Sequence, residues 1–284
     1  MTLTPTATLL AEASAASRAV GAFNVLHLET AEALVGAAER TGLAVILQVS
    51  ENCVRYHGSL EPIAAATLAV AEASSARVAV HLDHAEDPEL ALRAVELGFG
   101  SVMYDGAKLE FADNVAVTRR VVATAHAAGV AVEAELGEVG GKDGAHAPGV
   151  RTDPGEAARF VADTGVDALA VAVGSSHAMT ERTALIDLEL IARLRDAVPV
   201  PLVLHGSSGV SDDLIVRGIR SGLVKVNVST HLNAAFTGAI RGFLAEHPTT
   251  VDSRKVVAAG RDALGLEAAR LLELFAGTGR GADG

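Results

Sequence analysis

Residues 78–105, VAVHLDHAEDPELALRAVELGFGSVMYD, contain the pattern that decides the fold. The runs at 78–82 and 100–104 are short and aliphatic, whereas residues 87–97 place apolar side chains at helical spacing. Parallel neighbouring strands need a crossover connection, and that connection is usually a helix. The segment therefore predicts one strand–helix–strand unit of a parallel sheet.

The same alternation continues along the chain. Eight apolar runs, each followed by a helical segment, favour a closed barrel, since an open doubly wound sheet typically uses fewer strands. We predict an α/β protein with the (β/α)8 TIM barrel fold, formed by a single domain over residues 1–276 and followed by a flexible tail over 277–284. The predicted strands are residues 20–25, 43–49, 78–82, 100–104, 130–136, 168–173, 202–204 and 224–228.

The predicted helices lie between and after these strands. Ser211 and Asp153 precede two of them and can accept hydrogen bonds from amides of the first turn. The predicted helices are residues 29–40, 63–74, 87–97, 113–128, 154–163, 188–196, 212–221, 231–246 and 253–275.

Composition excludes several functional classes. The chain has 284 residues, is 50% hydrophobic and carries a formal charge of −12, and no segment supplies the clustered Lys and Arg of a nucleic-acid-binding surface. The single cysteine, Cys53, cannot form an intramolecular disulfide, and the N-terminus lacks a signal-peptide pattern. No apolar run approaches the roughly 20 residues of a membrane span. We expect a cytoplasmic protein that binds neither nucleic acid nor membrane.

Polar side chains end almost every predicted strand. In a barrel of this kind all strand ends face one rim, where active sites are assembled. A purely structural sequence would place such groups less regularly, so the rim is the predicted active site. The residues at the strand ends are Asn24, Gln48 with Ser50, Asp83 with His84, Asp105, Glu135, His177, His205 and Asn227.

Three histidines at this rim predict a metal site. A lone histidine beside an apolar run is more often a hydrogen-bonded core or rim residue. His84, His177 and His205, however, follow the third, sixth and seventh strands, so they converge over the barrel mouth. Three imidazoles with an open fourth position describe a catalytic zinc site, whereas structural zinc sites are closed and usually rich in cysteine.

Three carboxylates accompany the histidines. Asp83 directly precedes His84 and could act as a general base, with helix capping as the alternative. Asp105 and Glu135 could form a second carboxylate site for a metal, although hydrogen bonding to rim amides explains either residue alone.

The turns after the seventh and eighth strands, residues 204–209 and 225–230, are rich in Gly, Ser and Thr. Exposed amides and hydroxyls near a helix N-terminus can bind an anion, and this quadrant of barrels commonly holds phosphate. Two ordinary tight turns are the alternative interpretation.

At these residues the chain resembles the class II fructose-bisphosphate and tagatose-bisphosphate aldolases, over nearly its whole length. The matching motifs, in order, are AFNV at 22–25, VILQVS at 45–50, HLDH at 81–84, VEAELG at 132–137 with Gly140 and Gly141, AVAVGSSH at 170–177, LHG at 204–206 with Ser208 and Gly209, and KVN at 225–227 with Thr230.

The resemblance implies a role for each matched residue. It implies that His84, His177 and His205 hold a catalytic Zn²⁺, that Asp105 and Glu135 match a second cation position, divalent or monovalent, and that Asp83 exchanges the proton next to the ketone. The implied contacts to the substrate, chiefly to its phosphate, are Asn24, Ser50, Ala178, Gly206, Ser207, Ser208, Asn227, Val228, Ser229 and Thr230.

The implied activity is reversible aldol cleavage of a ketose 1-phosphate or 1,6-bisphosphate, foremost fructose 1,6-bisphosphate, to dihydroxyacetone phosphate and an aldehyde. Zinc would polarise the carbonyl and stabilise the enediolate, so no Schiff-base lysine is needed. The implied partner is a small phosphorylated sugar, the implied setting carbohydrate metabolism and glycolysis, and we expect a homodimer or homotetramer.

Four departures from the family pattern affect the expected specificity. Ala178 stands where the family usually has Gly, Leu26–His27 where it often has two asparagines, and Ala107 where Ser is common. The loop over residues 137–152 is shorter and less acidic than usual after Gly141. We predict that this loop is a lid and that Asp143 is its proton donor. Lys142 and His146 lie in the same segment, and a plain solvated loop is the alternative.

Three rival functions stay open at this point. An aldolase of the same mechanism could act on tagatose 1,6-bisphosphate or another ketose phosphate. A zinc hydrolase on a barrel would commonly begin with a His-x-His pair on its first strand, where this chain has Asn24. A catalytically inactive sugar-phosphate-binding barrel would have no need of Asp83 beside three histidines.

Overall fold

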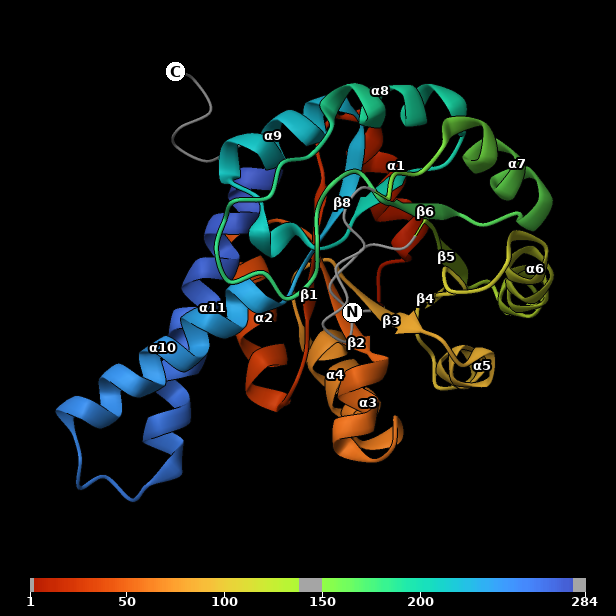
Figure 1. Ribbon diagram of the computed structural model, residues 1–284. Coiled ribbons are helices and arrows are strands. Elements are labelled where there is room, and N and C mark those ends of the chain that lie inside the picture. The colour runs from red at the N-terminus through yellow and green to blue at the C-terminus, as the bar shows by residue number, and fades with distance from the viewer. Residues whose placement is uncertain (1–2, 138–149, 278–284) are drawn as a thin grey trace.

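The computed structural model describes residues 3–137 and 150–277. Eight parallel strands form a closed barrel in sequence order, which confirms the predicted TIM barrel (Figure 1). The barrel closes by pairing of β1 with β8, in a register that sets Val20 beside Lys225 and Ala22 beside Asn227. The strands are β1 (Val20–Asn24), β2 (Val45–Ser50), β3 (Val78–Ala85), β4 (Ser101–Tyr104), β5 (Ala131–Leu136), β6 (Ala168–Val171), β7 (Leu202–Leu204) and β8 (Leu223–Val228).

The helices surround this barrel. Two predicted caps are confirmed: the Asp153 side chain accepts a hydrogen bond from the Glu156 amide at 2.9 Å, and Ser211 accepts one from Leu214 at 3.4 Å. The described α-helices are α1 (Thr6–Ala15), α2 (Leu28–Thr41), α3 (Glu51–His57), α4 (Glu61–Ala73), α5 (Pro88–Glu96), α6 (Phe111–Ala127), α7 (Pro154–Thr164), α8 (Leu188–Ala197), α9 (Asp212–Ser221), α10 (Thr230–Glu246) and α11 (Ser253–Phe275).

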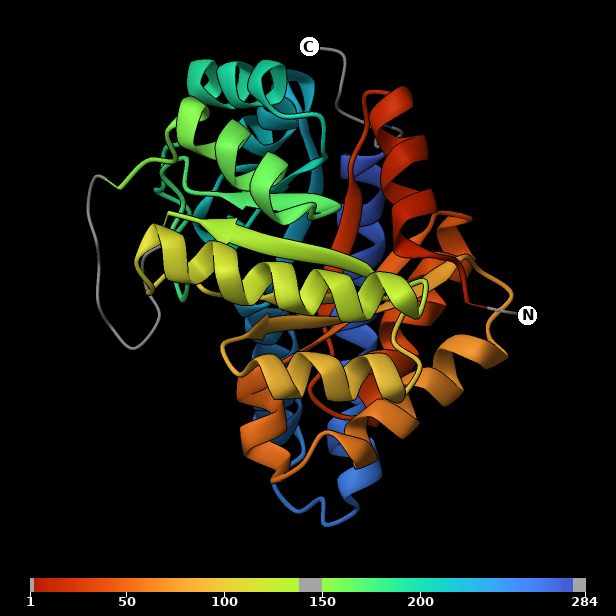
Figure 2. The ribbon, with the colours of Figure 1, turned by 90° about the vertical axis from the view of Figure 1, so that its right-hand side faces the viewer.

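Two of these helices are absent from the predicted set. Helix α1 precedes the barrel and inserts Leu9, Leu10 and Ala13 into the apolar cluster of the barrel interior. It lies at the end of the barrel opposite the C-terminal ends of the strands (Figure 2). Helix α3 has only seven residues and is capped by Ser50, whose hydroxyl accepts from the Cys53 amide at 3.2 Å.

The core has two parts because the strands bury both faces. The larger cluster fills the space between the barrel and its helices. The smaller cluster fills the α1 end of the barrel interior, where Ile46, Ala79, Met103 and Val203 pack together. Inward-facing residues alternate along each strand, so the polar residues further along the same strands face the interior near the rim.

Strand β3 is longer than the sequence pattern indicates. It continues to Ala85, so that Asp83 and His84 belong to the strand rather than to the turn after it. The cap of α5 is Asp87, whose carboxylate accepts from the Glu89 amide at 2.9 Å. The alternative role of Asp83 as a helix cap is therefore wrong, because Asp87 is the N-terminal cap of α5.

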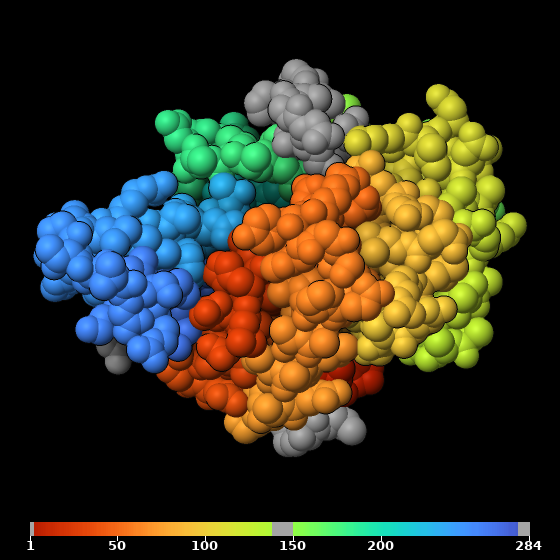
Figure 3. Space-filling model, turned by 90° about the horizontal axis from the view of Figure 1, so that it is seen from below, coloured from red at the N-terminus to blue at the C-terminus, as the bar shows by residue number. Residues whose placement is uncertain are grey.

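Helices α10 and α11 form an antiparallel pair that extends beyond the barrel (Figure 1). Helix α11 packs along α2, and in Figure 3 the pair stands out at one side of the molecule next to α2. No described helix combines the length and the apolar character that crossing a membrane requires.

Candidate active site at the C-terminal rim of the barrel

A cavity of about 250 Å³ lies at the C-terminal ends of the strands. The predicted rim residues from β1, β2, β3 and β8 meet there with the turns that follow β6 and β7. The cavity is lined by Asn24, Gln48, Ser50, Glu51, Asn52, Arg55, Asp83, His84, Glu86, His177, Ala178, Gly206, Ser207, Ser208, Asn227, Ser229 and Thr230.

The three predicted histidines converge in this region. The ring centroids lie 4.9 Å apart for His84 and His177, 4.4 Å for His84 and His205, and 5.9 Å for His177 and His205, and each pair of rings is nearly perpendicular. Together with Glu135 they offer ligand atoms that all lie within 4.8 Å of one another. Three imidazoles and one carboxylate are a donor set that suits zinc, and this spacing lets a single ion reach all four after small movements.

The negative charges around His205 also favour a bound cation. Burial alone would lower the pKa of this fully buried imidazole, but the carboxylates of Glu133 and Glu135 outweigh burial and raise the pKa to about 9. Two buried carboxylates thus favour a positive charge at this position, which either a proton or a metal ion can supply.

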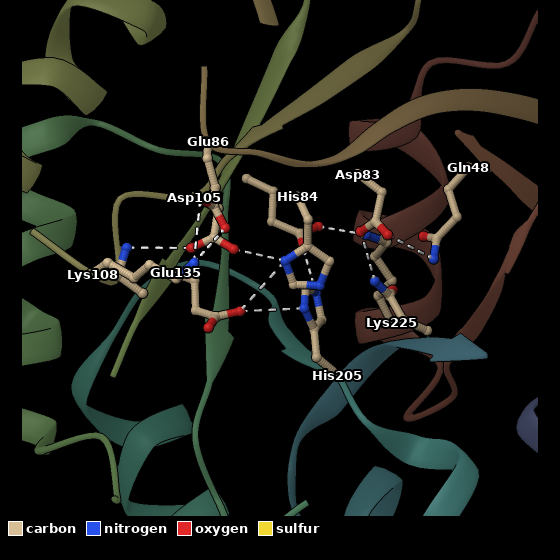
Figure 4. Close-up of polar contacts among 12 residues, drawn as sticks. Gln48, Asp83, His84, Glu86, Asp105, Lys108, Glu135, His205 and Lys225 are labelled. Atoms are coloured by element: carbon tan, nitrogen blue, oxygen red, sulfur yellow. Dashed lines mark hydrogen bonds and ion pairs between the residues drawn. The ribbon is translucent and has the colours of Figure 1, made fainter. Parts of the chain in front are cut away.

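The two carboxylates predicted as a second metal position lie in different places. Glu135 belongs to the histidine cluster, with its Oε2 atom 3.4 Å from His205 Nδ1. Asp105 contacts the His84 ring instead, with its Oδ2 atom 2.8 Å from Nδ1 (Figure 4). Such a contact holds one ring nitrogen of a ligating imidazole and orients the other toward the metal. A separate second cation position for this pair stays a prediction.

Asp83 is held between two amide side chains. Its carboxylate accepts from Asn227 Nδ2 at 3.2 Å and from Gln48 Nε2 at 3.5 Å, and Gln48 also donates to Asn24 at 2.7 Å. Burial raises the pKa of Asp83. The nearby charges of His84, His205 and Lys225 lower the pKa by more than burial raises it, so the net shift is downward. Asp83 is therefore ionised at neutral pH and sits beside the histidine cluster, as a base requires.

The turns after β7 and β8 form the opposite wall of the cavity. Gly206 has φ of 65°, and a Cβ atom there would lie 2.6 Å from the Ser176 carbonyl carbon, so only glycine lets this turn approach the turn that carries His177. Ser207 donates its hydroxyl hydrogen bond to the Asn227 carbonyl and ties the two turns together. Ser229 and Thr230 begin the 17-residue helix α10, whose N-terminus favours an anion.

Four described site residues of the predicted set, Asp105, Glu135, His205 and Val228, do not line this cavity. The Val228 side chain is buried in the outer core cluster, so only its backbone could take part in binding. Asp143 lies outside the described residues, as does most of the predicted lid. The other nine predicted substrate contacts line the cavity.

Two non-glycine residues of the site adopt the left-handed backbone region. His84 has φ of 51° and Ala178 has φ of 58°. The cost of such a conformation is often retained at functional sites, where it fixes the direction of a side chain. Ala178, which stands where glycine is usual in the related family, pays that cost without a functional side chain.

Replacing Ala178 by glycine should therefore stabilise the protein. The left-handed region costs a residue with a Cβ atom about 1–2 kcal/mol, and the extra backbone entropy of glycine offsets roughly 0.5–1 kcal/mol of the gain. Denaturant unfolding should show a higher free energy of unfolding by about 0.5–1 kcal/mol. The matched control is Ala65→Gly on the exposed face of α4, which should lose about 1 kcal/mol. A loss of stability in Ala178→Gly would contradict the strain.

Sequence reasoning missed the residues directly beneath the histidine cluster. Glu133, Lys225 and His81 are buried inside the barrel, and none of them was predicted as a site residue. The available signal was the two-residue period: Glu133 precedes Glu135 by two, Lys225 precedes Asn227 by two and His81 precedes Asp83 by two. A residue two positions before an inward rim residue also points inward.

Comparison with known proteins decides the family of this site. A family model described as fructose-bisphosphate aldolase class-II matches residues 4–280. The chain belongs to this family. It is 39% identical over 287 residues to a fructose-bisphosphate aldolase of Geobacillus stearothermophilus, and the alignment covers 100% of both chains.

Solved aldolase structures show the same barrel. The YdjI aldolase of Escherichia coli K12 has a TM-score of 0.84 at 31% identity, covering 100% of this chain and 99% of that one. A fructose-bisphosphate aldolase of Campylobacter jejuni has a TM-score of 0.80 at 20% identity, covering 94% and 93%, which shows the shared fold alone. This chain is thus a class II aldolase, a lyase of a metal-dependent family, and the zinc-hydrolase alternative is excluded.

Proposed function

We propose that this class II aldolase cleaves fructose 1,6-bisphosphate reversibly, giving dihydroxyacetone phosphate and an aldehyde. The observation that carries the proposal is the position of Asp83, an ionised carboxylate in the cavity that is also lined by His84, by His177 and by the turns after β7 and β8. A base, a metal-ligand set and a phosphate subsite are the three parts that cleavage of a ketose phosphate requires.

We assign the zinc site to His84, His177 and His205, with Glu135 as a neighbouring carboxylate. A zinc ion held there would supply Lewis-acid chemistry at the substrate carbonyl. Asp105 keeps the His84 ring in place through its contact with Nδ1. Glu135 keeps negative charge next to His205, which favours retention of a cation.

We propose that Asp83 is the base that exchanges the proton at the carbon next to the ketone. Its two amide partners fix the direction of the carboxylate. The phosphate would lie against the backbone amides of residues 206–208, Ser229, Thr230 and the N-terminus of α10, because these groups supply positive potential in an acidic protein. Ser207 contributes through its amide, since its hydroxyl is bonded to the Asn227 carbonyl.

We further propose that the loop at 137–152 closes over the aldehyde half of the substrate and that Asp143 protonates the leaving alkoxide. Support comes from the sequence, which places Asp143 in a glycine-containing segment directly after β5, the strand of Glu135. Glu51, Asn52 and Arg55 of α3 also line the cavity.

A panel of ketose phosphates tests the substrate. With zinc present, kcat/KM for cleavage should be highest for fructose 1,6-bisphosphate, lower for tagatose 1,6-bisphosphate, and lower again for fructose 1-phosphate, which lacks the second phosphate. A preference of tenfold or more for tagatose 1,6-bisphosphate would overturn the proposed stereochemistry. Failure to cleave any member of the panel would overturn the proposed substrate class.

A further inference from the structure

A connected row of buried polar groups lies inside the barrel, directly beneath the histidine cluster. Lys225 Nζ is 2.6 Å from Glu133 Oε2, and Glu133 Oε1 is 2.9 Å from His205 Nε2. Lys225 Nζ also lies 3.4 Å from His81 Nε2. Lys225 and His205 have no exposed surface, and Glu133 and His81 are 3% and 1% exposed. Lys225 and His205 are labelled in Figure 4.

This row differs from what a barrel interior usually contains. Barrel interiors are normally filled by layers of branched aliphatic residues. Burying an ion pair gives little net stability, because desolvation offsets the attraction between the charges. Neither Glu133 nor Lys225 lines the cavity of the candidate site, so neither is placed to contact substrate. A purely structural reason for the pair is therefore weak.

The geometry at His205 gives the pair a different purpose. Glu133 contacts the Nε2 atom of the imidazole, and Nδ1 faces Glu135, the carboxylate next to the proposed zinc site. Glu133 and Glu135 are both on β5 and point to the same face, so one strand contacts both nitrogens of the ring. An imidazole held in this way has a fixed tautomer and a fixed ring direction.

We propose that Glu133 and Lys225 form a positioning pair that orients His205 for metal binding. Glu133 holds Nε2 by a hydrogen bond, and Lys225 fixes Glu133 by occupying its other oxygen. The inference rests on the proposed function in one respect, namely that His205 is a metal ligand. It goes beyond that function because it assigns a role to two residues that touch neither metal nor substrate.

Lys225 is itself fixed from below. His81 Nδ1 lies 2.7 Å from Ser101 Oγ, and Ser101 Oγ lies 2.7 Å from Thr6 Oγ1 at the start of α1. Burial, followed by the nearby charge of Lys225, lowers the pKa of His81 to about 3, so His81 is neutral and adds no second positive charge. Between α1 and His205, the chain of contacts therefore carries one lysine and one carboxylate.

The test replaces the pair by apolar residues of similar size, as Glu133→Leu with Lys225→Met. Exchanging a buried ion pair for apolar side chains is often neutral for stability, so this double variant should fold with a melting temperature close to wild type. Its zinc affinity, measured by competition with a chromogenic chelator, should fall by about 10- to 100-fold. With Co²⁺ in place of zinc, the visible absorption bands should shift, because they report ligand geometry.

A second double variant separates orientation from charge. Glu133→Gln with Lys225→Met is also neutral overall, but its amide oxygen can still accept from His205. It should recover part of the zinc affinity lost in the apolar variant, and equal losses in both would contradict the orienting hydrogen bond. The matched control is Thr164→Val on α7, which removes a buried 2.7 Å hydrogen bond far from the site and should leave zinc affinity unchanged.

Failure of this inference can be told apart from failure of the metal site. If the apolar double variant folds and binds zinc as tightly as wild type while His205→Ala binds weakly, the metal site stands and the positioning pair is wrong. If His205→Ala binds zinc as tightly as wild type, His205 is not a ligand, and both the ligand assignment and the inference are overturned.

Discussion

Replacing Asp83 by alanine should lower turnover by about 10²- to 10⁴-fold while zinc content stays at the wild-type level, because the base is lost and the ligands are kept. The decisive measurement is exchange of the α-proton of dihydroxyacetone phosphate with solvent deuterium. That half-reaction would need the base and the metal but neither the aldehyde nor the proposed lid. Both exchange and cleavage should therefore fall together.

The pH dependence follows from the same residue. The folded-state pKa of Asp83 is lowered, so the active, ionised form is present above that pKa and is lost as pH falls through it. Because the ordinary value for aspartate is already about 4, Asp83 should contribute no inflection to the kcat profile between pH 5 and 8.

A matched control for Asp83 is available in the same segment. Asp87→Ala removes the cap of α5 and should cost about 1 kcal/mol of stability without lowering the exchange rate. Exchange at the wild-type rate in Asp83→Ala would assign proton abstraction to another residue. Loss of zinc in that variant would instead show that the residue supports the metal site.

Removal of the metal should abolish cleavage. A Lewis acid contributes several kcal/mol to such a reaction, so a chelator-treated, verified metal-free preparation should be slower by about 10³-fold or more. The fold should survive, since two extensive apolar clusters hold the barrel together independently of the histidines. Activity should return with added Zn²⁺, and circular dichroism should stay unchanged throughout.

The rival chemistry for an aldolase is a Schiff base on a lysine. Lys225 lies inside the barrel, but it is fully buried and paired with Glu133 at 2.6 Å, which leaves it unsuited to attack a carbonyl. Borohydride added during turnover should therefore neither inactivate the enzyme nor attach substrate to the chain. A trapped lysine adduct, or full activity without metal, would reject the proposed mechanism.

The rim of the site could be predicted from sequence because parallel strands all end on the same side. Once residues 78–82 and 202–204 are recognised as strands, the positions of His84 and His205 at one rim follow from barrel geometry. The spatial cluster confirms that His84, His177 and His205 meet. The periodic pattern also gave all eight strands to within a few residues.

The parts that could not be predicted depend on tertiary contacts. The partners of Asp105 and Glu135 differ although both lie at the C-terminal ends of strands. Asp105, directly after β4, contacts Nδ1 of His84, whereas Glu135, within β5, lies near His205. Helix α1 lies outside the strand–helix repeat, so its place over the open end of the barrel has no local signal. The roles of Ser207 and Val228 were set by hydrogen bonding and burial that no motif reveals.

The chain of contacts from Thr6 to His205 bears on how such an enzyme can be rebuilt. Barrel engineering commonly treats the strands as an inert scaffold and the rim loops as a removable module. Here a buried lysine and carboxylate join the two, so grafting this rim onto a barrel with an aliphatic interior would transfer His205 without the carboxylate that contacts its Nε2 atom. A transferable unit of this aldolase would have to include Glu133 and Lys225 along with the loops.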